Sequence, residues 1–210
     1  MNLPQKFLLA GFLAATGLNA LAAESYTLEP NHTQVLFTWN HFGFSNPSAN
    51  FETIEGTLQW DEENPEKSSV NITIPVDSLD AHVERFDAHL RSKDFFEMDK
   101  YPTITFNSTG VQRGAGENSL VITGDLTMHG ITKPVELDAI LTKSGQHPSW
   151  QAPALGFDAA TTLKRSDFGL DKLAPGVSDE VQLKITVEAV QTEGYQAALK
   201  ARAARKARAN

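Results

Sequence analysis

The 210-residue chain contains no cysteine. Disulfides, thiolate metal ligands and a cysteine nucleophile are therefore excluded, and so is an N-terminus anchored through an acylated cysteine. The stability of the fold must come from a packed core, and a chain of this length can bury one.

Long apolar runs are also missing, apart from one at the start of the chain. Lys6 is followed by an apolar run over residues 7–15 and then by the small-residue pattern of residues 20–22. This layout is typical of a cleaved secretory signal peptide. The run is too short to cross a bilayer as a helix, which needs about 20 residues. We therefore expect residues 1–22 to be a signal peptide and the mature protein to be secreted.

Basic residues are scarce in the body of the chain. The whole sequence has 18 Lys and Arg against 26 Asp and Glu, a net charge of -8. Six of the 18 are Lys6 and five residues after Gly194, so the body keeps 12 basic residues against all 26 acidic ones, a net of -14. Such a body repels polyanions, and nucleic acid is not expected as a partner.

The Ala-rich segment 194–210 has the opposite charge. Its cations are Lys200, Arg202, Arg205, Lys206 and Arg208, and it contains no acidic residue. Two interpretations stay open for this basic tail. It is either a solvated appendage or a helix that makes transient contact with an anionic membrane surface.

Alternation of apolar and polar residues recurs between residues 23 and 193, and it predicts β-strands in a single domain. The clearest example is residues 181–187, where Val, Leu, Ile and Val alternate with polar residues. Turn signals such as Asn64-Pro65 separate the strands. We count roughly eight strands, the number at which a closed antiparallel barrel can hold one small ligand. The expected fold class is all-β, an eight-stranded barrel, with a two-sheet sandwich as the alternative.

The stretch ERFDAHLRSKDFFEMDKYPTITF, residues 84–106, interrupts this pattern. Phe86 and Leu90 lie at helical spacing, and Pro102 restarts a strand. The apolar side chains of Phe86, Leu90, Phe95 and Phe96 must meet an apolar surface, and the mouth of a barrel provides one. We therefore predict that residues 84–96 form a short helical lid over one end of the barrel.

Catalytic and metal-binding motifs are not found. His82 and His89 are separated by about two helical turns, which is too far to chelate one ion. There is no G-x-S-x-G motif and no phosphate-binding loop. The sequence therefore predicts no enzyme, no metal site and no cofactor. A hydrolase of lipid esters would lack an activated nucleophile.

Four segments resemble the YceI family of secreted bacterial proteins. They are HTQVLFTWNHFGFSNPSANFETIEGTLQWD, HVERFDAHLRSKDFFEMDKYPTITFNSTGV, ITGDLTMHGITKPVELDA and EVQLKITVEAVQTE. The likeness covers about Tyr26 to Glu193. The family's motif positions in the lid and the strand after it are His82, Arg85, His89, Leu90, Arg91, Phe95, Tyr101 and Pro102.

This resemblance implies a lipocalin-like antiparallel β-barrel in the periplasm. The barrel would hold a long-chain polyisoprenoid lipid or an isoprenoid quinone, for transport, storage or sequestration. Related domains fused to b-type cytochromes imply an alternative role, a quinone-binding accessory to a membrane redox enzyme. No catalytic residues come with the family, and a homodimer is left open.

The predicted ligand site consists of barrel-lining and lid residues. The apolar set is Phe37, Trp39, Phe42, Phe44, Phe51, Phe86, Leu90, Phe95, Phe96, Ile104, Phe106, Leu126 and Met128. The polar head of the ligand is expected to contact His41, Arg85, His89 and Arg91. The competing hypothesis is a solid barrel whose interior is filled by its own Phe and Trp side chains.

Overall fold

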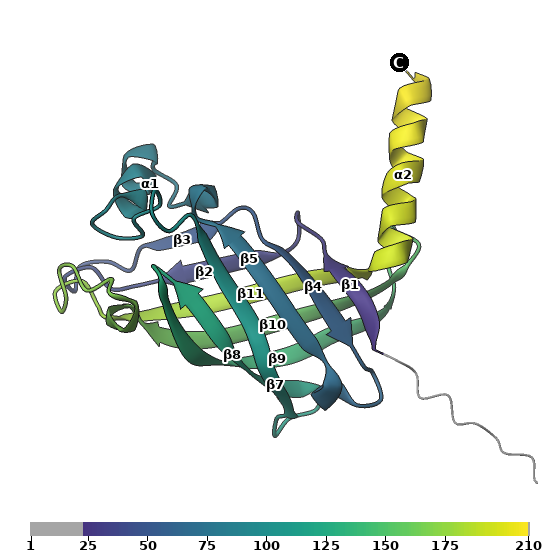
Figure 1. Cartoon of the computed structure of the whole chain (residues 1–210), viewed down its shortest axis with the longest axis horizontal. Coiled ribbons are helices and arrows are strands. Elements are labelled where there is room, and N and C mark those ends of the chain that lie inside the picture. Colours follow the sequence, from purple (N-terminus) through teal and green to yellow (C-terminus); the bar gives the residue numbers. More distant parts are fainter. Residues whose placement is uncertain (1–22, 210) are drawn as a thin grey trace, which may run out of the picture.

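The alternating segments form β-strands, because a period of two places every second side chain on the same side of the sheet. The computed structural model describes residues 23–209, and the predicted signal peptide lies outside them. Within this range the chain forms eleven strands and two α-helices (Figure 1). They are β1 (Glu24–Leu28), β2 (Gln34–Thr38), β3 (Ser48–Phe51), β4 (Glu55–Trp60), β5 (Ser69–Pro75), β6 (Leu79–Asp80), α1 (Glu84–Arg91), β7 (Thr103–Arg113), β8 (Ser119–Met128), β9 (Ile131–Gln146), β10 (Pro153–Lys164), β11 (Glu180–Gln191) and α2 (Thr192–Ala209), with 3₁₀ turns η1 (Pro65–Lys67), η2 (Val76–Ser78) and η3 (Arg165–Phe168).

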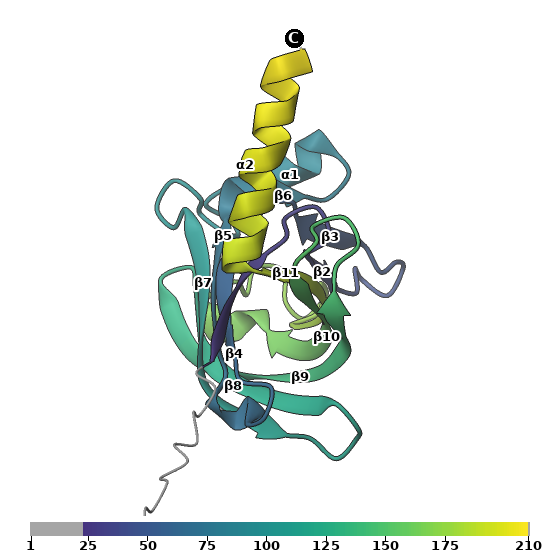
Figure 2. The ribbon, with the colours of Figure 1, turned by 90° about the vertical axis from the view of Figure 1, so that its right-hand side faces the viewer.

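Eight of the strands close into an antiparallel barrel. Their order is β1-β4-β5-β7-β8-β9-β10-β11, and β11 returns to β1 through pairs such as Leu28 with Ala189. Figure 2 shows these strands as a ring. Closure removes the exposed sheet edges that a sandwich would leave. The prediction of an eight-stranded antiparallel barrel is confirmed, and the sandwich alternative is wrong.

The three remaining strands widen one end of the barrel. The last residues of β11 pair with β1, whereas residues 182–186 of β11 pair with β2. β2 then pairs with β3, and β3 pairs with the two-residue strand β6. This strip leads directly into α1, so it places the lid at the widened end (Figure 1).

The lid is fastened to the strip by polar contacts and faces the barrel with its apolar side. Leu90 and Phe96 are buried, and the Phe96 amide donates to the Leu90 carbonyl at 3.0 Å. Asp87 Oδ1 accepts a hydrogen bond from the Ala81 amide at 2.6 Å, and Arg91 donates to a backbone carbonyl of β6. The insertion therefore covers one end of the barrel, as predicted.

Helix α2 continues from β11 at the opposite end of the barrel (Figures 1 and 2). Its first turns are held by Tyr195, whose ring centroid lies 4.6 Å from that of Trp150. The Arg202 guanidinium lies 3.6 Å from the Trp150 ring centroid and donates to the Ser149 carbonyl at 2.9 Å. Among residues 23–209, no helix is both long enough and apolar enough to span a membrane.

Candidate ligand-binding site

An apolar cavity of about 250 Å³ lies beneath the lid, and we call it the outer cavity. Its wall combines strands of the barrel with the strip, the lid and the loop after η3. Twelve of the predicted site residues border it. They are Phe37, Trp39, His41, Phe51, Phe86, His89, Leu90, Phe95, Phe96, Ile104, Leu126 and Met128. The aromatic rings pack against one another, for example Phe37 and Phe51 at 5.5 Å between centroids.

A second apolar cavity of about 160 Å³, the inner cavity, lies deeper in the barrel. The two cavities share five wall residues, which places them end to end. The shared residues are Val35, Ile74, Leu126, Leu163 and Leu183. Phe106, another predicted residue, lines the inner cavity, where Trp60 and Phe157 also meet at 5.5 Å. The interior of the barrel is therefore hollow in part, contrary to the solid-barrel hypothesis.

The prediction that Phe42 and Phe44 line the barrel was wrong. Both lie in the connection between β2 and β3, where the alternation of β2 has ended after Thr38. Phe42 is 50% exposed and Phe44 is 92% exposed, and neither borders the outer or the inner cavity. Phe42 also has a positive φ of 52°.

Two of the predicted polar contacts also lie away from the cavities. Arg85 is exposed on α1, next to the inward-facing Phe86. Arg91 is committed to the Leu79 carbonyl and holds the lid on β6. His41 and His89 do border the outer cavity, and their contact with a ligand head stays a prediction.

Arg165 is a site residue that sequence reasoning missed. It borders the outer cavity and is only 8% exposed. Its guanidinium donates to backbone carbonyls of the closing loop, which we define as residues 169–178. The acceptors are Leu170, Lys172 (2.9 Å), Val177 (2.8 Å) and Ser178 (2.8 Å). Burial lowers the pKa of this guanidinium from its ordinary value, and the carbonyls compensate for its lost hydration.

The closing loop contributes directly to the cavity wall. Leu170, Leu173 and Val177 all border the outer cavity. Because Arg165 ties the loop to the end of β10, this one side chain fixes the position of three apolar wall residues. The sequence signal is weak, since an Arg after a strand normally lies on the surface.

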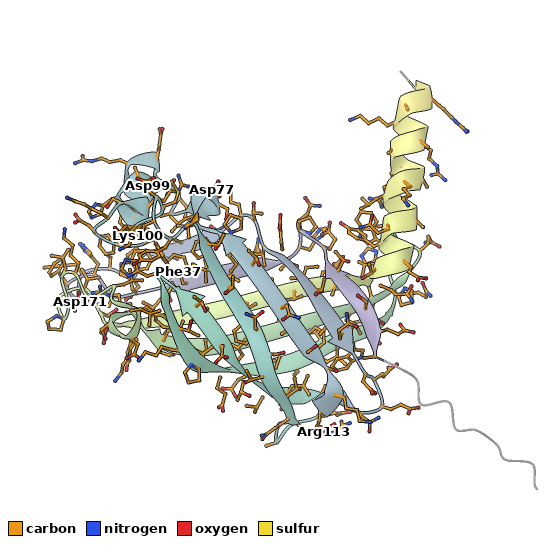
Figure 3. The ribbon with its side chains drawn as sticks, in the orientation of Figure 1. Phe37, Asp77, Asp99, Lys100, Arg113 and Asp171 are labelled. Carbon is orange, nitrogen blue, oxygen red and sulfur yellow. The ribbon has the colours of Figure 1, made fainter. Side chains whose placement is uncertain are left out.

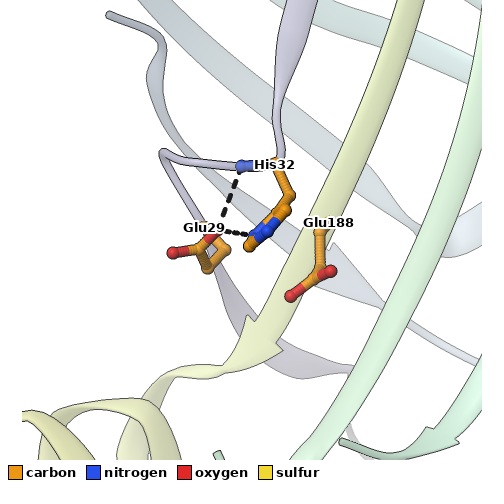
Figure 4. Close-up of side chains that lie close together, drawn as sticks. All are labelled: Glu29, His32 and Glu188. Atoms are coloured by element: carbon orange, nitrogen blue, oxygen red, sulfur yellow. Dashed lines mark hydrogen bonds and ion pairs between the residues drawn. The ribbon is translucent and has the colours of Figure 1, made fainter. Parts of the chain in front are cut away.

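A separate polar cluster lies outside both cavities, where β1 turns toward β2 (Figure 4). Glu29 is fully buried, and its carboxylate accepts hydrogen bonds from Asn31 and from the His32 amide. His32 Nδ1 lies 2.6 Å from Glu29 Oε2, and the donor atoms of Glu29, His32 and Glu188 all lie within 4.8 Å of one another. Zinc accepts such ligands. The buried carboxylate is already saturated by the turn, however, which indicates a structural anchor.

This anchor predicts a pH-dependent contribution to stability. The hydrogen bond to Glu29, reinforced by its charge, raises the pKa of His32. A raised folded-state pKa means that the stabilisation is complete below the unfolded value, about 6.5, and is lost as the pH rises through the folded value. We expect the difference in unfolding free energy between the wild type and His32→Gln to shrink from about pH 5 to about pH 8 in urea titrations. A difference that stays constant across this range would contradict the assignment.

These features define the class of the protein, a lipocalin-like β-barrel with a helical lid over an apolar hollow. The family model described as "YceI-like domain" matches residues 26–189. Protein YceI of Salmonella arizonae is 41% identical over 186 residues, which covers 88% of this chain and 95% of the relative. The chain therefore belongs to the YceI family, and the resemblance seen in its motifs is confirmed.

Solved structures show the same architecture. The crystal structure of Burkholderia cenocepacia BcnA superposes with a TM-score of 0.67 at 25% identity, covering 74% of this chain and 95% of that one. A polyisoprenoid binding domain from Saccharophagus degradans superposes with a TM-score of 0.60 at 12% identity, covering 80% of this chain and 99% of that one. The second likeness concerns the fold alone.

Proposed function

We propose that this protein is a periplasmic carrier that holds a long-chain isoprenoid lipid or isoprenoid quinone inside the barrel. Transport, storage and sequestration are the roles that such a carrier serves, and no chemical step is assigned to it. The observation that carries the proposal is the pair of apolar cavities in series beneath the lid. A long, narrow, oily molecule fits such a shape. The name of the Saccharophagus degradans domain, which describes polyisoprenoid binding, supports the same class of ligand.

The expected affinity is consistent with such a ligand. Burial of hydrocarbon contributes about 0.8 kcal/mol per carbon, so one five-carbon isoprene unit gives up to roughly 4 kcal/mol before costs. Three or four buried units give roughly 12 to 16 kcal/mol. Association and ordering reduce this to a net dissociation constant of about a micromolar or lower. Directed hydrogen bonds are not required.

The charges favour a neutral head group. Arg165 is the cation on the wall of the outer cavity, and the closing-loop carbonyls occupy its guanidinium. His41 and His89 are left as polar groups of the wall that can contact a head. The body of the chain also carries a large net negative charge, which disfavours a pyrophosphate. An isoprenoid quinone is therefore the preferred ligand.

The experiment compares two ligands with the same prenyl chain. We expect the protein to bind an isoprenoid quinone at least tenfold more tightly than the matching prenyl pyrophosphate, measured for both ligands by calorimetric titration. Arg85→Ala serves as the control and should change neither affinity, because Arg85 lies outside the cavity. Tighter binding of the pyrophosphate would overturn the head-group assignment, and no binding of either would overturn the proposed function. Native mass spectrometry of the exported protein would identify the natural ligand.

The basic tail would give the carrier a second, weaker contact, with an anionic membrane surface. Helix α2 extends away from the acidic body (Figure 1), and the spacing of its five cations does not confine them to one narrow face of the helix. Each Lys or Arg near an anionic bilayer contributes about 1 kcal/mol at moderate ionic strength. With no apolar face, α2 would adsorb electrostatically and would not insert. The homodimer and the role as a redox-enzyme accessory stay predictions.

A further inference from the structure

The connection between β2 and β3 forms an uncharged, apolar tip at the lid end of the barrel. Residues 30–51 contain no Asp, Glu, Lys or Arg, although charged residues make up 21% of the chain. The tip is Phe42-Gly43-Phe44, and we call it the rim tip. The Phe42 side chain is half exposed and the Phe44 side chain is almost fully exposed. Exposure of so much apolar surface to water is unfavourable. This is the composition of a segment that contacts an apolar medium.

The backbone of the rim tip has its amides already paired. The Phe42 amide donates to the Gly176 carbonyl at 2.8 Å, and the Phe44 amide donates to the His41 carbonyl at 3.0 Å. The Gly43 amide donates to Asn40 Oδ1 at 2.7 Å. Unpaired amides are what normally keeps a loop out of a membrane. Because these three amides have partners within the protein, entry of the rim tip into a lipid interface, where water and head groups can bond its carbonyls, leaves none of these amides unpaired.

The apolar surface continues from the rim tip into the outer cavity. The Phe42 ring packs against Gly176 of the closing loop. Leu173 of the same loop is 52% exposed and also borders the outer cavity. Val83, just before α1, is 58% exposed. Six large hydrophobic side chains are exposed within residues 23–209. Four of them lie on segments around the outer cavity, namely Phe42, Phe44, Val83 and Leu173.

The views place these segments at one end of the molecule. In Figure 1, α1 and the loop that follows β10 occupy the same end, away from α2. In Figure 3, Asp171 marks the outer tip of the closing loop and Phe37 lies farther in, at the barrel. The backbone bridge between His41 and Val177 joins the rim tip to the closing loop.

We propose that this rim docks on the surface of a lipid bilayer, with Phe42 and Phe44 inserted at the boundary between head groups and acyl chains. The inference rests on the proposed lipid-binding function, because the docked rim gives an isoprenoid chain a path from the bilayer to the outer cavity that avoids water. The rim tip itself carries no charged residue, so the insertion of Phe42 and Phe44 is an apolar contact, distinct from the electrostatic contact of α2.

The test uses the double variant Phe42→Ser, Phe44→Ser in the full mature chain. The variant is mixed with sucrose-loaded phosphatidylcholine vesicles at about 1 M salt, where the Debye length of about 3 Å screens α2. We expect the wild type to sediment with the vesicles and the variant to partition at least tenfold more weakly. Ile140→Ser is the matched control, because Ile140 is an exposed hydrophobic residue on β9, 44% accessible and away from the rim. It should partition like the wild type.

Two further readouts separate docking from ligand binding. Quinone affinity in solution, measured by Trp fluorescence, should be unchanged in the folded double variant, while quinone transfer from vesicles to protein should slow at least tenfold. Equal vesicle partition of wild type and variant overturns the docking proposal. So does light scattering that shows a wild-type dimer, lost in the variant, together with no vesicle binding, because the rim would then pair two copies of the chain. A wild type that docks but binds no quinone overturns the proposed function and leaves docking intact.

Discussion

Val35→Trp is expected to weaken binding of a long-chain isoprenoid quinone at least hundredfold. Val35 lies on the wall shared by the outer and inner cavities, and an indole at this position fills the passage between them. A ligand confined to the outer cavity loses at least one isoprene unit, worth up to roughly 4 kcal/mol, and tenfold in affinity corresponds to about 1.4 kcal/mol. Calorimetric titration measures the change, because the added indole alters the Trp fluorescence.

Leu36→Trp is the matched control for this substitution. Leu36 is the next residue on β2, and its side chain points to the outer face of the barrel. The control should bind the long-chain quinone like the wild type. A quinone with a single isoprene unit does not need to reach past Val35, so Val35→Trp should weaken its binding less than tenfold. Similar losses for Val35→Trp and Leu36→Trp would place the ligand elsewhere.

Arg165→Leu is expected to destabilise the protein by about 3 kcal/mol or more. The leucine leaves four carbonyls of the closing loop without their charged donor, and each such hydrogen bond contributes about 1.5 to 3 kcal/mol, although the contributions do not add. Urea unfolding measures the loss of stability. Hydrogen exchange should show the amides of residues 169–178 opening first, because Arg165 fixes this loop.

Arg113→Leu is the control for Arg165. Arg113 is exposed and makes one ion pair, with Glu66 Oε1 at 3.0 Å. Exposed pairs contribute little, so this variant should stay within about 0.5 kcal/mol of the wild type. Quinone affinity should fall in Arg165→Leu, since Leu170, Leu173 and Val177 leave the wall, and should not fall in Arg113→Leu. Unchanged exchange in the closing loop of Arg165→Leu would show that other contacts hold the loop.

The barrel was predictable because its signal is periodic. Alternation in long strands such as β11 specifies which side chains face inward, and closure follows from the need to cover the sheet edges. The strip was not predictable in the same way. β3 has four residues and β6 has two, which is too few for a period to be recognised. The pairing of one strand, β11, with two partners is a property of the folded barrel.

Site residues on the strands and the lid could be predicted from the sequence, whereas those in the loops could not. Phe37 and Trp39 alternate on β2 and face the outer cavity, whereas Phe42 and Phe44 look similar in composition but follow the end of that strand. Arg165 was missed because its burial depends on where four loop carbonyls converge in space, and no local pattern encodes this. Arg85 and Arg91 occupy motif positions of the family, but neither lines the outer or the inner cavity. Arg85 is exposed to solvent on α1, and Arg91 donates to the Leu79 carbonyl of β6.

A crystal structure of the protein loaded with an isoprenoid quinone tests the central claim most directly. We expect density for the prenyl chain in the outer cavity between Phe37 and Leu126, continuing past Val35 into the inner cavity, with the lid closed above it. A stoichiometric complex in which both cavities are empty, or in which the chain lies on the outer face of the barrel, would contradict the account.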